Sequence, residues 1–138
     1  MSTLKTSNIQ DTSGNNNSTP EQIIKGRAKA WVHFDGTTGT LNQADVTMQS
    51  SFNVTSITDA GDGEYTIDLT NAMANTNYLI LATTGIETNR FRGVFERIDF
   101  TRTASQFRVT NAGQSASSSG LNSGETDSSR ISVAVFGD

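Results

Sequence analysis

The 138-residue sequence has no cysteine and only one proline and one histidine. Without cysteine the chain can form neither a disulfide framework nor a zinc–thiolate site, so packing alone must stabilise the fold. Hydrophobic residues are also scarce, at 33% of the chain. This predicts a thin core, or one that is shared with another chain. We therefore expect a homo-oligomer, with a trimer favoured.

The chain also lacks an excess of basic residues, because its net charge is −4. Such a charge is repelled by phosphate backbones, which argues against general nucleic-acid binding. No apolar run approaches the ~20 residues that cross a bilayer, and the start of the chain, MSTLKTSNIQ, lacks the apolar centre of a signal peptide. We expect no membrane insertion, and a protein that stays in the cytoplasm unless a particle carries it out.

The sequence offers little for catalysis. Its only histidine, His33, stands between Val32 and Phe34, and a Ser-His-Asp arrangement would depend on this residue alone. The position favours a strand histidine that is hydrogen-bonded or faces solvent. We predict no catalytic residues and a protein that is not an enzyme; a small glycan depolymerase is the enzymatic alternative.

Three carboxylates, Asp59, Asp62 and Glu64, stand in and beside the turn DAGDG and could collect calcium or supply an acid and a base. Their spacing does not match a calcium loop, and aspartate in such a turn is expected from its backbone hydrogen bonds alone. Gly61 and Gly63 join two strands instead of leading into a helix, which argues against a phosphate-binding loop. We predict neither a metal nor a cofactor.

The first part of the chain is polar, with twelve Ser, Thr or Asn among its first nineteen residues. Leu4 and Ile9 are its only aliphatic side chains, too few to order the segment alone. We predict a flexible arm over residues 1–18, in which these two residues contact a partner. A short helix should follow, because Thr19 can cap, Pro20 fits the first helical position, and Gln22 completes a capping box. The alternative is an irregular turn around the proline.

Period-two alternation dominates the chain after residue 29. It places Trp31 and His33 on the opposite face to their neighbours in the first strand, and it predicts a hairpin closed by the DAGDG turn. A weak edge strand is expected over 41–49, and residues 111–130, rich in serine and glycine, are predicted to form a long surface loop. Seven or eight short strands predict an all-β fold: a single antiparallel β-sandwich or jelly-roll-like domain over 19–138.

Two strand predictions concern packing. The nearly continuous apolar segment 78–82 predicts a strand that is covered on both faces. Residues 92–109 predict a hairpin that turns at 103–105, with Ile98 and Phe100 facing Phe107 and Val109. Aromatic side chains could stack on sugars, although burial in the core is favoured; the candidates are Trp31, Tyr65 and Tyr78.

Arginine is concentrated between residues 90 and 108. This nineteen-residue segment holds five arginines and two acids, a charge of +3 against −7 for the remainder. Arg90 and Arg92 share one strand face, where they could meet acidic groups of another copy, of another protein or of an anionic sugar. The favoured alternative is a solvated hairpin face with cross-strand ion pairs, for example from Arg97.

One segment carries a family resemblance. The sequence FNVTSITDAGDGEYTIDLTNAMANTNY, flanked by TPEQIIKGRAKAWVHFDGTTGT and by the closing ISVAVFG, resembles modules of tail-fibre and other virion structural proteins of tailed bacteriophages, notably those of marine and cyanobacterial hosts. The similarity covers roughly residues 18 to 83 and the last strand.

The resemblance implies a non-enzymatic virion structural protein of the tail-fibre or receptor-binding type. It would be assembled in the host bacterial cytoplasm and would bind other virion proteins, with a host surface glycan as a further class of partner. The alternative is a capsid decoration, head-fibre or tail adaptor protein that its N-terminal arm anchors to the particle.

Overall fold

The computed structural model describes residues 2–3, 5–14, 17–85, 90–117 and 120–137, and it confirms the all-β prediction. Nine strands and one short helix occur in this part of the chain. They are α1 (Pro20–Gly26), β1 (Ala30–Asp35), β2 (Thr47–Phe52), β3 (Val54–Gly61), β4 (Glu64–Leu69), β5 (Leu79–Thr84), β6 (Arg90–Glu96), β7 (Gln106–Ser117), β8 (Gly120–Glu125) and β9 (Ile131–Phe136).

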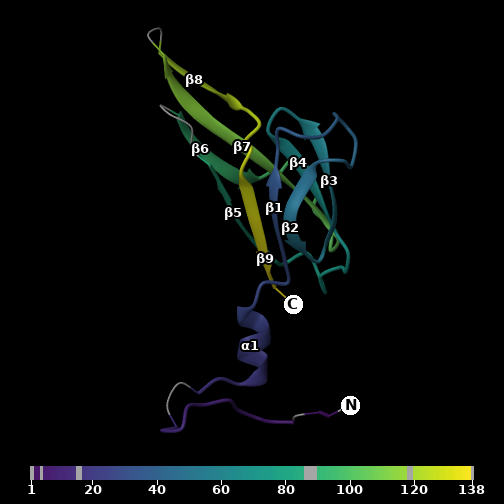
Figure 1. The fold of residues 1–138 in the computed structure, drawn as a ribbon, viewed down its shortest axis with the longest axis vertical. Helices are drawn as coiled ribbons and strands as arrows, with labels where there is room; N and C mark the ends of the chain where they lie inside the picture. Colours follow the sequence, from purple (N-terminus) through teal and green to yellow (C-terminus); the bar gives the residue numbers. More distant parts are fainter. Residues whose placement is uncertain (1, 4, 15–16, 86–89, 118–119, 138) are drawn as a thin grey trace.

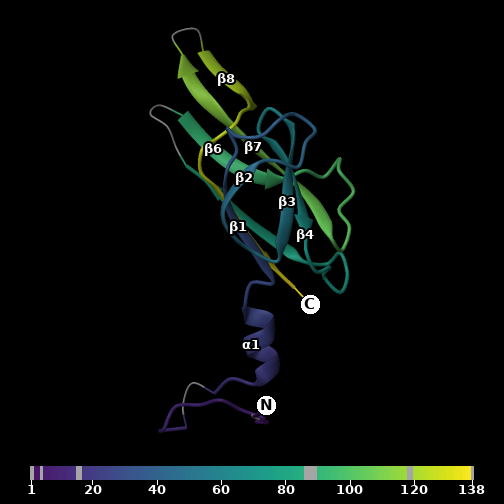
Figure 2. The same cartoon turned by 45° about the vertical axis from the view of Figure 1, so that its right-hand side comes forward.

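The strands form two antiparallel sheets that pack as a sandwich (Figures 1 and 2). The four-stranded sheet has the order β2-β1-β9-β5, and we call it sheet one. Sheet two has the order β3-β4-β7-β6, and β8 also pairs with β7. Because β6 pairs with the middle of β7, β4 and β8 must share the other edge of that long strand.

The core lies between the sheets and is built on aromatic contacts. The rings of Phe34 and Tyr65 meet edge to face with centroids 5.1 Å apart, and those of Tyr78 and Phe107 meet at 6.0 Å. The Tyr65 hydroxyl donates to Asp127 Oδ1 at 2.7 Å, so its polar end is satisfied inside the core. The favoured prediction of burial is confirmed for Tyr65 and Tyr78, and it is wrong for Trp31, which is 41% exposed.

The predicted helix is confirmed, with its cap. Thr19 Oγ1 accepts a hydrogen bond from the Gln22 amide at 3.2 Å, and Gln22 Oε1 accepts one from the Thr19 amide at 2.8 Å. Pro20 begins the helix and Gly26 is its last residue. No residue of α1 is buried, and Figure 1 shows the helix leading away from the sandwich toward the N-terminus.

The predicted loop over residues 111–130 is wrong. β7 continues to Ser117, and β8 pairs with it from Ala112 opposite Glu125 to Ser117 opposite Gly120. This hairpin forms the upper end of the molecule in Figure 1. Its ladder is made of backbone hydrogen bonds, which serine and glycine can form as well as any residue. Side-chain content alone therefore did not reveal it.

Two smaller predictions also need correction. The strand expected over 41–49 begins only at Thr47, because turns occupy the preceding residues and Asn42 has a φ of 63°. The hairpin of β6 and β7 exists, but Glu96 is the residue opposite Val109. Ile98 stands in the connection and is 93% exposed, since the chain has already left the ladder there.

The expectation that residues 78–82 are covered on both faces is wrong for the single chain. β5 is an edge strand of sheet one, with Leu79 56% exposed and Leu81 53% exposed. Ile80 and Ala82 turn inward and pack against the core. The outward half of this apolar strand is left uncovered, which directs attention to the outer face of sheet one.

Candidate functional site: the outer face of sheet one

An apolar row crosses the outer face of sheet one. The strand register places Phe52 beside Trp31, Trp31 beside Ala134, and Ala134 beside Leu81. These four residues thus connect β2, β1, β9 and β5 in one transverse line. Phe52 is 54% exposed and Trp31 is 41% exposed. The inward neighbours of Trp31 on β1, Ala30 and Val32, are buried, so alternation along the strand accounts for the exposure of the indole.

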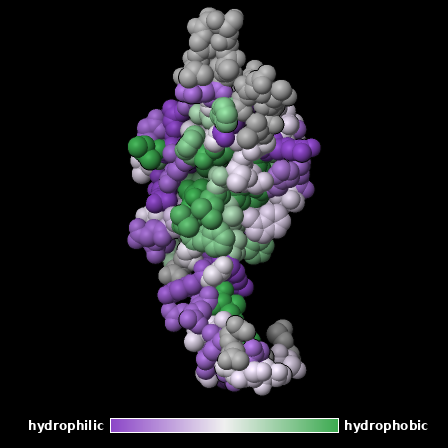
Figure 3. Space-filling view, turned by 90° about the vertical axis from the view of Figure 1, so that its left-hand side faces the viewer, coloured by the Kyte–Doolittle hydropathy of each residue, from purple (hydrophilic) through white to green (hydrophobic). Residues whose placement is uncertain are grey.

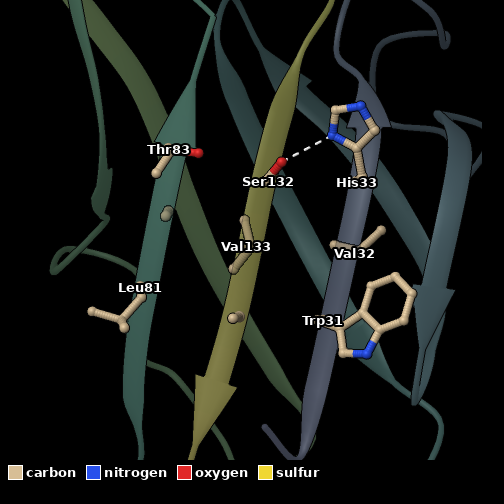
Figure 4. A pocket seen from close by; sticks show the side chains of 9 residues that line it. Trp31, Val32, His33, Leu81, Thr83, Ser132 and Val133 are labelled. Carbon is tan, nitrogen blue, oxygen red and sulfur yellow. Dashed lines mark hydrogen bonds between the residues drawn. The ribbon is translucent and has the colours of Figure 1, made fainter.

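A polar row lies next to it. Here the register aligns Ser50, His33, Ser132 and Thr83 across the same four strands. His33 Nδ1 and Ser132 Oγ lie 2.9 Å apart and share a hydrogen bond, drawn in Figure 4. The prediction of a hydrogen-bonded strand histidine is confirmed. Together we call the two rows the outer face.

The outer face includes a shallow hollow of about 520 Å³ lined by Trp31, His33, Leu81, Thr83 and their neighbours on β9 (Figure 4). None of the eight positions in the two rows is Asp, Glu, Lys or Arg. Among the described side chains, no carboxylate is hydrogen-bonded to the His33 ring, which a triad would require. The two rows therefore present an uncharged surface that is apolar along one row and polar along the other.

The helix and arm carry a second apolar surface. Ile9, Ile23 and Ile24 are each about half exposed, and they line a groove of about 480 Å³ together with Lys5, Thr6 and Pro20. The arm is held in a loop by a bridge between Ile9 and Ser18. Leu4, the other predicted arm contact, lies outside the described residues. The contact role of Ile9 stays a prediction, and its exposure is compatible with it.

The predicted pair Arg90 and Arg92 is placed only in part. Both residues belong to β6, but the side chain of Arg90 is outside the described part of the structure. Arg92 is half-buried, and its Nη1 donates to the Asp127 carbonyl oxygen at 2.7 Å. Val94, which shares its face of the strand, packs against the core. One guanidinium contact of Arg92 is thus internal, and its role toward a partner stays a prediction.

The remaining arginines of the cluster form ion pairs within the chain. Arg97 joins Asp99 at 2.8 Å and also contacts Glu64 and Glu125. The hydrogen bond to Asp99 is the main cause that raises the pKa of Arg97, and the same bond lowers the pKa of Asp99. The cross-strand pairing predicted for Arg97 is confirmed.

Arg102 and Arg108 stack on aromatic rings as well as pairing with acids. Arg102 lies 4.9 Å from the Tyr78 ring centre and 3.2 Å from a Glu96 oxygen. Arg108 lies 4.6 Å from the ring centre of Phe100 and donates to Thr66 Oγ1 at 2.9 Å. Phe100 therefore packs beneath an arginine, not against Phe107 as predicted. Arg97, Arg102 and Arg108 therefore all make contacts with acids or aromatic rings of their own chain.

Backbone hydrogen bonds account for Asp59 and Gly63 in the DAGDG turn. Asp59 Oδ1 accepts from the Gly61 amide at 3.0 Å, as predicted for an aspartate in such a turn. Gly63 has a φ of 69°, and its amide donates to Asp127 Oδ1 at 2.9 Å. Within the described residues no three His, Cys, Asp or Glu side chains gather as a metal site would require.

In the sequence, the outer face is indicated only by the alternation of residues along single strands. The pattern places Trp31 and His33 on one face, but for residues 78–82 it predicts a strand that is covered on both faces. Pattern alone could not show that β1 and β5 flank the same strand, β9. The exposure of Phe52, Leu79 and Leu81 was therefore missed, as was that of Ile23 and Ile24 on the helix.

No family model, no curated protein and no solved structure matches this chain. In the described part of the chain, no helix has the length and apolar content to span a membrane.

Proposed function

We propose that this chain is a non-enzymatic structural subunit of a tailed-phage virion, of the tail-fibre or receptor-binding type. The sequence resemblance described above supports it. The observation that carries it is the helix α1, which projects from the sandwich with no buried residue. A seven-residue helix is marginal alone in water, where stable isolated helices need roughly 12–15 residues, so it needs a surface to pack on. A larger assembly supplies such a surface.

The second candidate is a capsid decoration, head-fibre or tail adaptor protein. The arrangement of the molecule favours this reading in one respect. The arm and α1 lie at one end, and the β7–β8 hairpin lies at the other (Figure 1). An arm that docks on a shell would leave the sandwich and its hairpin pointing outward.

Quantitative mass spectrometry of purified particles tests both candidates. A fibre subunit is expected at a few copies per particle, and a decoration protein at hundreds. Gold-labelled antibody against the β7–β8 hairpin would place the protein on the tail or the head in electron micrographs. If the chain is made during infection but is missing from purified particles, the proposed function is wrong.

A further inference from the structure

We propose that the outer face of sheet one and the helix α1 form a single interface between copies of this chain, with the copies side by side and their helices adjacent. The inference rests on the proposed function, in that it names the partner on which a structural subunit would assemble. Its occupant is a second copy, and its centre is the row of Phe52, Trp31, Ala134 and Leu81.

The first argument is the location of apolar surface. β5 lies at the left of the sandwich in Figure 1 and carries the exposed Leu79 and Leu81. Figure 3 looks at that side and shows a continuous hydrophobic area over the sandwich. The same view shows further hydrophobic surface below the sandwich, toward the helical end of the molecule, and α1 carries the half-exposed Ile23 and Ile24. One partner can therefore cover both surfaces, and large uncovered apolar patches are typical of interfaces.

The second argument is charge. Each copy carries a net charge of −4, so two copies repel wherever acidic surfaces meet. The two rows bring none of this charge into contact, because their eight positions include no Asp, Glu, Lys or Arg. On α1, Glu21 and Lys25 have opposite charges and pair with each other at 2.8 Å. The two rows also have no charged side chains with which to attract or select a highly charged partner. Two copies can therefore bring their two rows together without electrostatic repulsion.

The third argument concerns the chemical class of the partner. An anionic ligand would need basic side chains, which the two rows lack. A neutral glycan would use the exposed indole of Trp31, but the half-exposed leucines Leu79 and Leu81 offer it no stacking surface. Leucine, tryptophan and phenylalanine together match the apolar centre of a protein interface. A cyclic arrangement of copies, with its axis along the length of the molecule, would also give each short helix a helical neighbour.

The single tryptophan of the chain makes the test direct, because Trp31 sits at the centre of the row. We would measure the mass of the unmodified protein by light scattering, and its tryptophan emission, across a dilution series. An oligomer is expected, with blue-shifted emission that moves to longer wavelength as dilution releases monomers. This measurement needs no variant.

Leu81→Asp should abolish assembly and leave the emission red-shifted at every concentration. Ile98→Asp is the matched control, because Ile98 is also exposed but lies in the β6–β7 connection, and it should assemble as the parent does. Ile23→Ser combined with Ile24→Ser should weaken assembly by at least about tenfold. Circular dichroism would check that each variant is folded; if Leu81→Asp is not, the dilution series decides alone.

Three results would overturn the inference: a parent protein that is monomeric at high micromolar concentration, an oligomer that folded Leu81→Asp leaves intact, and a Trp31 emission that assembly does not change. Blue-shifted emission only on adding soluble host glycan would assign the face to a sugar instead. The particle analysis described above is independent. A monomeric chain found in virions would refute this interface and leave the proposed function standing.

Discussion

At the scale of single residues, Tyr65 connects the core to the loop before β9. Its ring is fully buried against Phe34, and its hydroxyl donates to Asp127 Oδ1 at 2.7 Å and lies 3.1 Å from the Gly36 carbonyl oxygen. Asp127 also accepts from the Gly63 amide. A single side chain thus ties both sheets to the segment that leads into the last strand.

Tyr65→Phe should fold and lose about 1–2 kcal/mol of stability, because the ring packing remains and the hydrogen bonds are removed. Asp127 keeps its bond from Gly63, so the variant leaves that carboxylate partnered. Urea unfolding followed by far-ultraviolet circular dichroism would measure the difference. A variant as stable as the parent would show that the hydroxyl contributes nothing.

Stability should fall in alkaline solution, with Tyr65 as a main cause. Burial first, and then the hydrogen bond to Asp127, raise the pKa of Tyr65 above its ordinary value of 10.0. The unfolded chain therefore loses this proton at lower pH than the folded chain does. The stabilisation is complete below pH 10 and declines as pH rises above it.

Tyr65→Phe should show a shallower decline than the parent between about pH 9 and pH 11, as measured by urea midpoints. Some decline will remain, because burial also raises the pKa of Tyr78. Equal slopes in the parent and the variant would contradict the assignment to Tyr65.

At the scale of elements, the β3–β4 hairpin depends on Gly63. Its φ of 69° lies in the left-handed region, and a Cβ there would stand 2.5 Å from both the Asn111 carbonyl oxygen and the Thr126 amide nitrogen. Asn111 stands where β7 changes its partner from β4 to β8, and Thr126 directly follows β8 and donates its amide hydrogen to the Asn111 carbonyl oxygen at 3.1 Å. Both are backbone atoms held in place, so neither can move aside cheaply. The turn is therefore packed into the junction of three strands.

Gly63→Ala should cost more than about 2 kcal/mol, from backbone strain and the clash with fixed backbone atoms. Gly124→Ala is the matched control, because nothing lies within 4 Å of a Cβ at that position. Thermal unfolding of the two variants beside the parent would test the difference. Similar midpoints for both variants would show that the junction can relax.

The elements also show where the sequence was informative. Thr19, Pro20 and Gln22 predicted α1 because a helix cap is a local arrangement of neighbouring residues. The DAGDG hairpin was predictable for the same reason. β8 was not, because its pairing with β7 satisfies backbone groups while its serines and glycines carry no strand pattern.

At the scale of the whole molecule, the sandwich and the N-terminal part are separate in their packing. Among the residues that the structure describes, none that precedes Ala30 belongs to the core, and α1 has no buried residue. The molecule is therefore a sandwich with a projecting attachment segment. We expect the two parts to differ in stability, since local contact density determines local unfolding.

Deletion of residues 1–18 should leave the sandwich folded and lower attachment to the particle. The strand signal in circular dichroism and the unfolding midpoint should stay close to those of the parent, because the described residues of the deleted segment supply nothing to the core. Reconstitution with particles that lack the protein would measure attachment. A truncated chain that fails to fold would show that the arm belongs to the sandwich.

The sequence by itself determined the class of fold, the capped helix, the β3–β4 hairpin and the alternating direction of side chains along β1. These properties depend on residues close together in the chain. Only the tertiary structure decided that Phe52, Trp31, Ala134 and Leu81 form one row, because that row requires four strands from distant parts of the sequence to lie in one register. The outer face is therefore a product of strand order, which no local pattern encodes.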